Sequence, residues 1–522
     1  MRIASNYRVF SHTFDEPCHL ATGLEWVDRG AYSLAPQQPP LARIGLAFGV
    51  YQMGLHYSED PDCNTAGKKT LYSGAGYEDI LAVSRAGNLP WFWIASLGVF
   101  FWCRRLTGAW PALAAVLLFT NLPPVLAHAG LATVDMGLTA TFVWAVYTFT
   151  LWLERPSLRT GLVFALALAA MVLSKFSCFL FFPAAVAAIL IAAMGGRPRP
   201  ALALSRRAAQ LAAVALLSSL VIWAGYRFSI GTLANAKSMR AFLNKPHGRW
   251  DRWAHLAANT PLPADKLFWG IGSVGVHAQE GHKSYFLGEV RSTGVWYFFP
   301  VLLAVKTPLG FLALALVGVL LSVRGYLRRR DWRLLAPAAA AAAMLLASLP
   351  ATINIGLRHI LPIYPLLSIV AAVAVAALWN SRRLRGASVA VAAALMAQVV
   401  VSAAIIHPDY LAYYNQLAGS RPELIHTDSD LDWGQDLFRL RDRARELKIP
   451  ALSVLYYGDA DLTMHGLPGL RILHPGETAT GWVAVSLNEL MVYRGSFGWL
   501  DGLPYQMVGR SIRLYWVPER RP

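Results

Sequence analysis

Charged residues are scarce in this sequence. Asp, Glu, Lys and Arg make up 15% of the 522 residues, whereas hydrophobic residues make up 56% and the mean hydropathy is +0.41. A water-soluble domain could not bury so much apolar surface, so the composition excludes an ordinary soluble protein and indicates a multi-pass membrane protein. The 18 tryptophans agree with this class, because indole rings favour the bilayer interface.

Cysteines are equally few. The four cysteines have neither the spacing of a metal site nor the pattern of a disulfide framework, which argues against a structural zinc site and a small disulfide-stabilised scaffold. Cys18 and Cys63 could pair if both lie outside the cell, but we do not expect this bond.

Acidic residues are outnumbered by basic ones, 30 to 47, giving a net charge of +17. Such a surplus can indicate nucleic-acid binding, but here the arginines gather in short loops between apolar runs, where they act as topology signals. We therefore expect no nucleic-acid partner, and by the positive-inside rule we place these loops in the cytoplasm. The loops contain Arg104 and Arg105; Arg155 and Arg159; Arg197, Arg199, Arg206 and Arg207; Arg324, Arg328, Arg329, Arg330 and Arg333; and Arg382, Arg383 and Arg385.

About ten apolar stretches are long enough to cross a membrane as helices. Residues 1–85, the loop at 228–295 and the tail from about 407 then lie outside the cell. No internal repeat relates the two halves of the chain. The stretches are 86–103, 109–127, 132–153, 160–175, 177–194, 208–227, 296–322, 333–350, 359–378 and 386–406.

The three outer segments have different patterns. Residues 1–85 start without a transmembrane helix, so we expect one to precede Met1 in the full gene product, and 39–55 is expected to be a helix along the membrane surface. The tail, 407–522, combines strand-like runs with a charged helix at 436–448. The predicted fold is an α-helical multi-pass membrane protein with about ten helices over 86–406 and a small C-terminal extracytoplasmic α/β domain.

Charged side chains collect at the outer ends of the apolar stretches. Such charges are costly near hydrocarbon and usually have a partner or a function. Each has a simpler interpretation: Asp135 as a helix cap, Lys175 and Arg358 as interfacial anchors, and Asp15 with Glu16 as a solvated pair. Their joint placement on one rim favours a site. The acids are Asp15, Glu16 and Asp135, and the bases are Arg43, Lys175, Lys306, Arg358 and His359.

Such a rim suits a donor linked through a lipid phosphate. A phosphate leaving group needs fixed cations, and an acceptor hydroxyl needs a carboxylate to take its proton. No protein nucleophile is evident, so direct displacement with inversion of the anomeric centre is the simplest mechanism. Asp15 is the expected base.

A set of motifs in chain order resembles the bacterial relatives of dolichyl-phosphate-mannose–protein mannosyltransferases, the PMT-like branch of the GT-C glycosyltransferases. It implies a membrane glycosyltransferase using a polyprenyl-phosphate sugar on the outer face of the bacterial cytoplasmic (inner) membrane. The resemblance also implies catalytic roles for Asp15, Glu16 and Asp135, and a donor-phosphate contact from a cation beside the paired prolines. The motifs are "TFDEPCHLATG", "PQQPPLAR", "LAHAGLATVDMG", "SKFS", "GHKSYFLGE", "VKTP", "INIGLRHILPIYP", "YLAYYNQLAG" and "DSDLDWGQDL".

The chain departs from that family pattern in three places. The leading transmembrane helix is absent. Gln38 replaces the basic residue before the prolines, leaving Arg43 as the nearest cation, and Asp430 replaces an asparagine. In the acidic run at 428–436 the glycine, Gly434, comes one place late for an EF-hand loop, and the twelfth position is Arg439. We therefore expect the run to cap the following helix.

Two other functions are open. A secondary transporter or lipid flippase is the main alternative, although repeated halves and midplane charges, apart from Lys306, are missing. The other is an inactive assembly subunit. The acceptor is a protein, a lipid or a polysaccharide. No cofactor is certain, and a divalent metal is possible.

Overall fold

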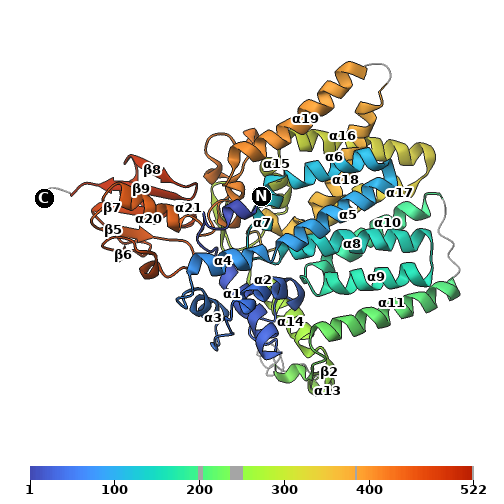
Figure 1. The fold of residues 1–522 in the computed structure, drawn as a ribbon, viewed down its shortest axis with the longest axis horizontal. Coiled ribbons are helices and arrows are strands. Elements are labelled where there is room, and N and C mark those ends of the chain that lie inside the picture. Colours follow the sequence, from blue (N-terminus) through green and yellow to red (C-terminus); the bar gives the residue numbers. More distant parts are fainter. Residues whose placement is uncertain (198–203, 236–250, 382–384, 520–522) are drawn as a thin grey trace.

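The computed structural model describes residues 1–197, 204–235, 251–381 and 385–519. Two parts are evident in Figure 1: a bundle of long helices on the right and a small sheet domain at the C-terminal end on the left. Short N-terminal helices lie between them. The predicted loop at 228–295 is only partly described, since 236–250 falls outside these ranges, as do some of the arginines used for topology.

All ten predicted apolar stretches are helical, but two of them are broken. The stretch at 109–127 forms two helices bent by 67°, because two prolines follow the break and cannot continue the first helix. The stretch at 296–322 breaks before Pro308. The bundle helices are α5 (Leu89–Thr107), α6 (Ala109–Thr120), α7 (Pro123–Ala129), α8 (Asp135–Glu154), α9 (Leu158–Val172), α10 (Cys178–Met194), α11 (Leu204–Gly225), α15 (Phe298–Lys306), α16 (Leu309–Arg329), α17 (Trp332–Ser348), α18 (Ile363–Trp379) and α19 (Arg385–Ile406).

Four helices in the described ranges are long and apolar enough to span a membrane, and the bent pair makes a fifth if it is one span. They lie within α8, α11, α16 and α19; four shorter apolar helices accompany them. Large apolar side chains on the outer helices are exposed, such as Ile191 at 66% and Ile405 at 78%. α8 instead occupies the centre, with 89% of its apolar window buried. The chain is therefore a multi-pass membrane protein, while the count of ten spans stays a prediction.

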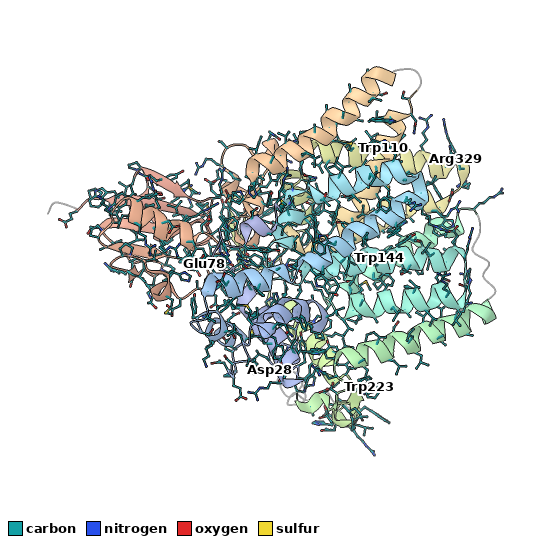
Figure 2. The ribbon with its side chains drawn as sticks, in the orientation of Figure 1. Asp28, Glu78, Trp110, Trp144, Trp223 and Arg329 are labelled. Atoms are coloured by element: carbon teal, nitrogen blue, oxygen red, sulfur yellow. A yellow bond between two sulfur atoms is a disulfide. The ribbon has the colours of Figure 1, made fainter. Side chains whose placement is uncertain are left out.

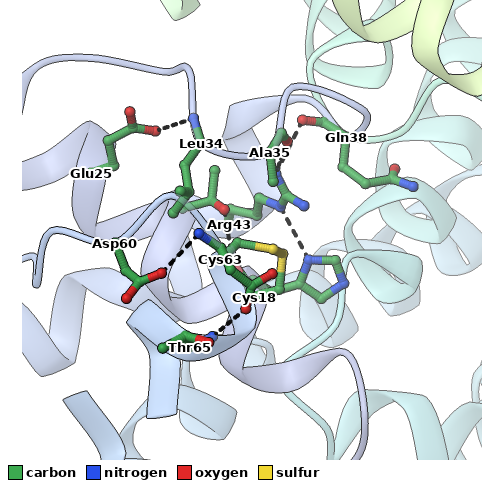
Figure 3. The surroundings of a disulfide bond; sticks show 12 residues. Cys18, Glu25, Leu34, Ala35, Gln38, Arg43, Asp60, Cys63 and Thr65 are labelled. Carbon is green, nitrogen blue, oxygen red and sulfur yellow. Dashed lines mark hydrogen bonds between the residues drawn. A yellow bond between two sulfur atoms is a disulfide. The ribbon is translucent and has the colours of Figure 1, made fainter. Parts of the chain in front are cut away.

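The N-terminal helices pack against one another through close backbone contacts. They are α1 (Glu16–Leu24), α2 (Pro40–Gln52), α3 (Cys63–Leu71) and α4 (Tyr77–Ala86). A Cβ on Gly67 would lie 2.0 Å from the Pro17 carbonyl oxygen, so only glycine lets α3 approach α1 this closely. That approach brings Cys18 and Cys63 together in a disulfide, with their Cα atoms 4.6 Å apart (Figure 3). The expectation that they stay unpaired was wrong.

The large loop contributes helices and a hairpin beside the N-terminal part. Its described elements are β1 (Ile230–Gly231), α13 (Asp251–Asn259), β2 (Leu262–Pro263), α14 (Asp265–Glu280), β3 (Ser284–Phe286) and β4 (Glu289–Arg291).

The C-terminal domain is built on a five-stranded mixed sheet in the order β6-β5-β7-β9-β8. One face packs on α20 (Leu437–Glu446), whose Leu437 and Leu440 join a core with Val454 and Leu514. The prediction of a small α/β domain is confirmed. The strands are β5 (Leu452–Leu455), β6 (Arg471–Ile472), β7 (Gly481–Ser486), β8 (Tyr505–Val508) and β9 (Ile512–Val517), and α21 (Leu487–Val492) follows β7.

The start of α20 joins this domain to the N-terminal loop. The expectation that the acidic run caps α20 was wrong, because the Asp436 side chain makes no capping bond. Its carboxylate instead accepts from the backbone N–H groups of Arg510 and Ser511. The Ser11 hydroxyl takes the capping role, accepting from the Leu437 N–H at 3.2 Å.

Candidate active site

Four of the predicted residues form one chain of ion pairs. Arg358 Nη1 lies 2.9 Å from Asp15 Oδ2 and 3.7 Å from Asp135 Oδ2. Lys175 Nζ lies 2.5 Å from the other carboxylate oxygen of Asp135. The four come from distant segments: the start of α1, the start of α8, the α9–α10 turn, and the short 3-10 helix η5 (Leu357–Ile360) before α18. The tertiary structure therefore collects these charges at one end of the bundle.

Solvent exposure differs sharply among the four side chains of these ion pairs. The Asp15 side chain is 32% exposed, whereas those of Arg358 and Lys175 are 8% and 7% exposed and that of Asp135 is fully buried. Asp135 makes no capping bond, and both cations are buried in ion pairs. Helix capping and interfacial anchoring therefore do not describe these residues. Of these four side chains, Asp15 is the one that is accessible from solvent.

Sequence reasoning missed part of the surroundings of Arg358. Its Nε donates to Ser429 Oγ at 3.2 Å, and its guanidinium lies over the Trp433 ring, 4.2 Å from the ring centre. Both residues belong to the "DSDLDWGQDL" motif. That motif was the available signal, but we assigned its acidic run to helix capping.

The segment before β3 approaches the same region. His282 Nε2 lies 3.7 Å from Asp428 Oδ2. The interaction with Asp428 raises the pKa of His282 above its ordinary value, although burial opposes the shift. His282 lies in the "GHKSYFLGE" motif, yet it was not among the predicted site residues. His359, which was predicted, follows Arg358 on η5, and its buried Nε2 has no hydrogen-bond partner among the described residues.

Glu16 points away from its neighbour Asp15. It is 1% exposed and pairs with Arg85 through two bonds of 2.8 Å. It also accepts from the backbone N–H groups of Ala132 and Thr13, both at 2.7 Å. Burial raises the pKa of Glu16, but Arg85 and these bonds outweigh that effect and hold it below the ordinary value. These contacts suit a structural carboxylate.

Two of the predicted substrate-binding cations, Arg43 and Lys306, bind carbonyl groups of the protein's own backbone. Arg43 Nη1 donates to the Ala35 carbonyl at 2.6 Å, and Arg43 Nε donates to His19 Nδ1 at 3.1 Å (Figure 3). Lys306 Nζ donates to the carbonyls of Leu411 and Asp430, at 2.7 and 2.5 Å. Neither side chain makes an ion pair with a described residue. Both hold loops around the site rather than joining its chain of charges.

The described ranges contain no group of three or more His, Cys, Asp and Glu residues that could hold a metal ion. The carboxylates of Asp15 and Asp135 are instead engaged by cationic side chains.

Comparison with known proteins gives a match to a family model over part of the chain, and a fold for the whole of it. Residues 89–224 match the family model described as dolichyl-phosphate-mannose-protein mannosyltransferase. ArnT from Cupriavidus metallidurans, solved with undecaprenyl phosphate bound, is similar at 12% identity and a TM-score of 0.50, covering 98% of this chain and 95% of that one. The chain has the GT-C fold and carries a PMT-type segment.

A second structure agrees. The archaeal oligosaccharyltransferase AglB from Archaeoglobus fulgidus, in complex with an inhibitory peptide and a dolichol-phosphate, is 12% identical with a TM-score of 0.51, covering 100% of this chain and 74% of that one. No curated protein matches the sequence significantly. The PMT-type match and the GT-C fold support a membrane glycosyltransferase, and neither supports a transporter or flippase.

Proposed function

We propose that this PMT-like chain transfers a sugar from a polyprenyl-phosphate donor to an acceptor hydroxyl, with Asp15 as the general base. The observation that carries the proposal is the accessible carboxylate of Asp15 beside the buried cations Arg358 and Lys175. A reaction that removes a proton at one end of the site and releases a phosphate at the other needs both kinds of group. Two proteins of the same fold have been solved with a polyprenyl phosphate bound.

The leaving group explains the two cations. A polyprenyl-phosphate sugar is a phosphodiester with one negative charge, and the released polyprenyl monophosphate carries nearly two. The extra charge develops as the sugar–oxygen bond breaks. Arg358 offers a planar fork of N–H donors and Lys175 a compact charge. Being buried, both act on the phosphate with little screening by water.

One displacement accounts for the transfer. The acceptor oxygen attacks the anomeric carbon from the face opposite the phosphate, and its proton passes to Asp15. The bond between that carbon and the phosphate oxygen breaks, and its electron pair leaves with the phosphate. The configuration inverts. In this scheme Arg358 loosens its hold on Asp15 as it turns to the phosphate, which restores the basicity of the carboxylate.

The reaction is placed on the outer face of a bacterial cytoplasmic membrane. Basic residues such as Arg329 lie at the right-hand end of the bundle in Figure 2, whereas Asp28 and Glu78 lie toward the other end. Positive loops favour the cytoplasm, so the site end faces outward. Cysteine introduced at Gly495, which has open space around it, should react with an impermeant reagent in intact spheroplasts, and one at Gly325 should be shielded. Labelling at Gly325 with protection at Gly495 overturns the orientation.

Asp15→Asn tests the catalytic proposal, because it keeps the shape and removes the basicity. Purified parent and variant are incubated with radiolabelled polyprenyl-phosphate sugars and a membrane extract, and the labelled product is identified. Transfer should fall by about a hundredfold or more, while donor binding changes little. Parent-like transfer by Asp15→Asn would exclude Asp15 as the base. Failure of the parent protein to label any acceptor from any polyprenyl-phosphate sugar would count against the function itself.

A further inference from the structure

A cavity of about 260 Å³ lies at the end of the bundle opposite the candidate active site. α8 begins with Asp135 in the candidate active site and ends 19 residues later with Glu154 in the cavity wall. At the rise of an α-helix the two places are about 30 Å apart. The wall is formed by the end of α5, the end of α8 and the start of α17. Its charged and aromatic members are Trp102, Arg105, Glu154, Arg155, Asp331 and Arg333.

Three guanidinium groups and two carboxylates meet in this wall. Glu154 bridges two of the arginines, with one carboxylate oxygen 2.8 Å from Arg105 Nη2 and the other 2.9 Å from Arg333 Nη1. Asp331 binds Arg333 as well, at 2.7 Å. Arg155 has no ion-pair partner in the described part of the chain. The wall therefore keeps one uncompensated positive charge, presented by a side chain that the fold leaves free.

The wall also contains a tryptophan, and the cavity has room for more than one water molecule. Trp102 is 2% exposed and lines the cavity, and no described residue accepts a hydrogen bond from its indole N–H. The volume is several times the share of about 30 Å³ that a water takes in the liquid. Free donors, surplus positive charge and this size together suit an anion larger than a simple ion.

We propose that this cavity binds a phosphate ester, with Arg155 as its charged ligand and the headgroup of an anionic membrane lipid as its natural source. Arginine pairs with phosphate oxygens through two parallel hydrogen bonds. Basic pockets between helices on the cytoplasmic side of membrane proteins bind such headgroups. The cavity lies at the arginine-rich helix ends, which are at the level of the lipid headgroups in a membrane. This site is separate from the proposed transfer reaction and does not depend on it.

The test compares Arg155→Gln with Arg159→Gln. Arg159 lies at the start of α9 and is exposed, as Arg155 is, but it does not line the cavity. Each variant is placed in nanodiscs containing phosphatidylglycerol or only phosphatidylcholine, and retained lipid is counted by native mass spectrometry. A second arm measures thermal stabilisation by soluble sn-glycerol 3-phosphate. Arg155→Gln should retain phosphatidylglycerol about tenfold more weakly than the parent, whereas Arg159→Gln should match the parent.

The two arms identify the source of the phosphate. Arg155-dependent retention of phosphatidylglycerol supports the lipid, and Arg155-dependent stabilisation by glycerol 3-phosphate alone supports a soluble ester. Equal loss of lipid retention in Arg155→Gln and Arg159→Gln would attribute the effect to general surface charge and overturn the site. Parent-like lipid retention and thermal stabilisation of Arg155→Gln would also overturn it. Because the Arg155 side chain makes no hydrogen bond or ion pair with a described residue, its replacement should leave folding intact. An unchanged unfolding temperature in phosphatidylcholine checks this.

Discussion

Glu16→Gln should damage the stability of this protein far more than its chemistry. Arg85 is fully buried, and all five of its N–H donors are used: two by Glu16 and three by the carbonyls of Tyr7, Phe10 and Ser11. Each carboxylate oxygen of Glu16 faces only donors. A glutamine amide would turn its NH₂ group toward such donors in either orientation, and the Arg85 charge would lose its counterion.

Removing one partner of a buried ion pair lowers the free energy of unfolding by about 3–5 kcal/mol. A folded domain has roughly 5–15 kcal/mol of stability in total, so this variant should lose a large fraction of it. The measurement is thermal unfolding of the purified protein in detergent, with the transfer rate expressed per folded molecule. Glu59→Gln is the matched control, because that side chain is 77% exposed and pairs only with the half-exposed Arg29.

Glu16→Gln should unfold at a clearly lower temperature than the parent, whereas the control should be unchanged. The folded fraction of Glu16→Gln should keep most of the parent's transfer rate, in contrast to Asp15→Asn. The reasoning is refuted if Glu16→Gln unfolds with the parent and has lost transfer by a hundredfold. In that case Glu16, not Asp15, supplies the base.

Three further predictions concern the surroundings of Asp15. Arg358→Gln should lower kcat by about a hundredfold with a smaller change in KM, since it acts on charge that develops in the transition state; a pure KM effect would contradict this. Cys18→Ser removes a cross-link between residues 45 positions apart, so it should lower the free energy of unfolding by about 3–4 kcal/mol. If the parent protein unfolds identically with and without reductant, the disulfide does not stabilise the fold. The contact with Asp428 raises the pKa of His282 in the folded state, so the stability that it contributes should be fully present below about pH 6.5 and be lost as the pH rises through the raised pKa. His282→Gln should therefore flatten the pH dependence of the unfolding temperature. An identical pH profile in variant and parent would contradict this.

The sequence predicted the location of the helices well, and the site only in part. All ten apolar stretches form helices, since a membrane requires long apolar runs with internally satisfied backbone groups. Asp15, Asp135, Lys175 and Arg358 were identified from charges at the ends of such runs, and the structure brings them together. Their membership of one site follows from helices that all end on the same side.

Which of two adjacent acids faces the site was beyond the sequence. Asp15 and Glu16 are neighbours, but they pair with arginines 343 and 69 positions away. The same holds for Cys18, whose bond depends on the close approach that Gly67 allows. Hydropathy and helix position are local properties, so the sequence alone determined the membrane class, the helices and the charges at the helix ends. The partner of each charged side chain depends on how distant segments pack. Therefore only the tertiary structure decided that Glu16, Arg43 and Lys306 make structural contacts. It also decided that Asp15 and Arg358 meet in the candidate site.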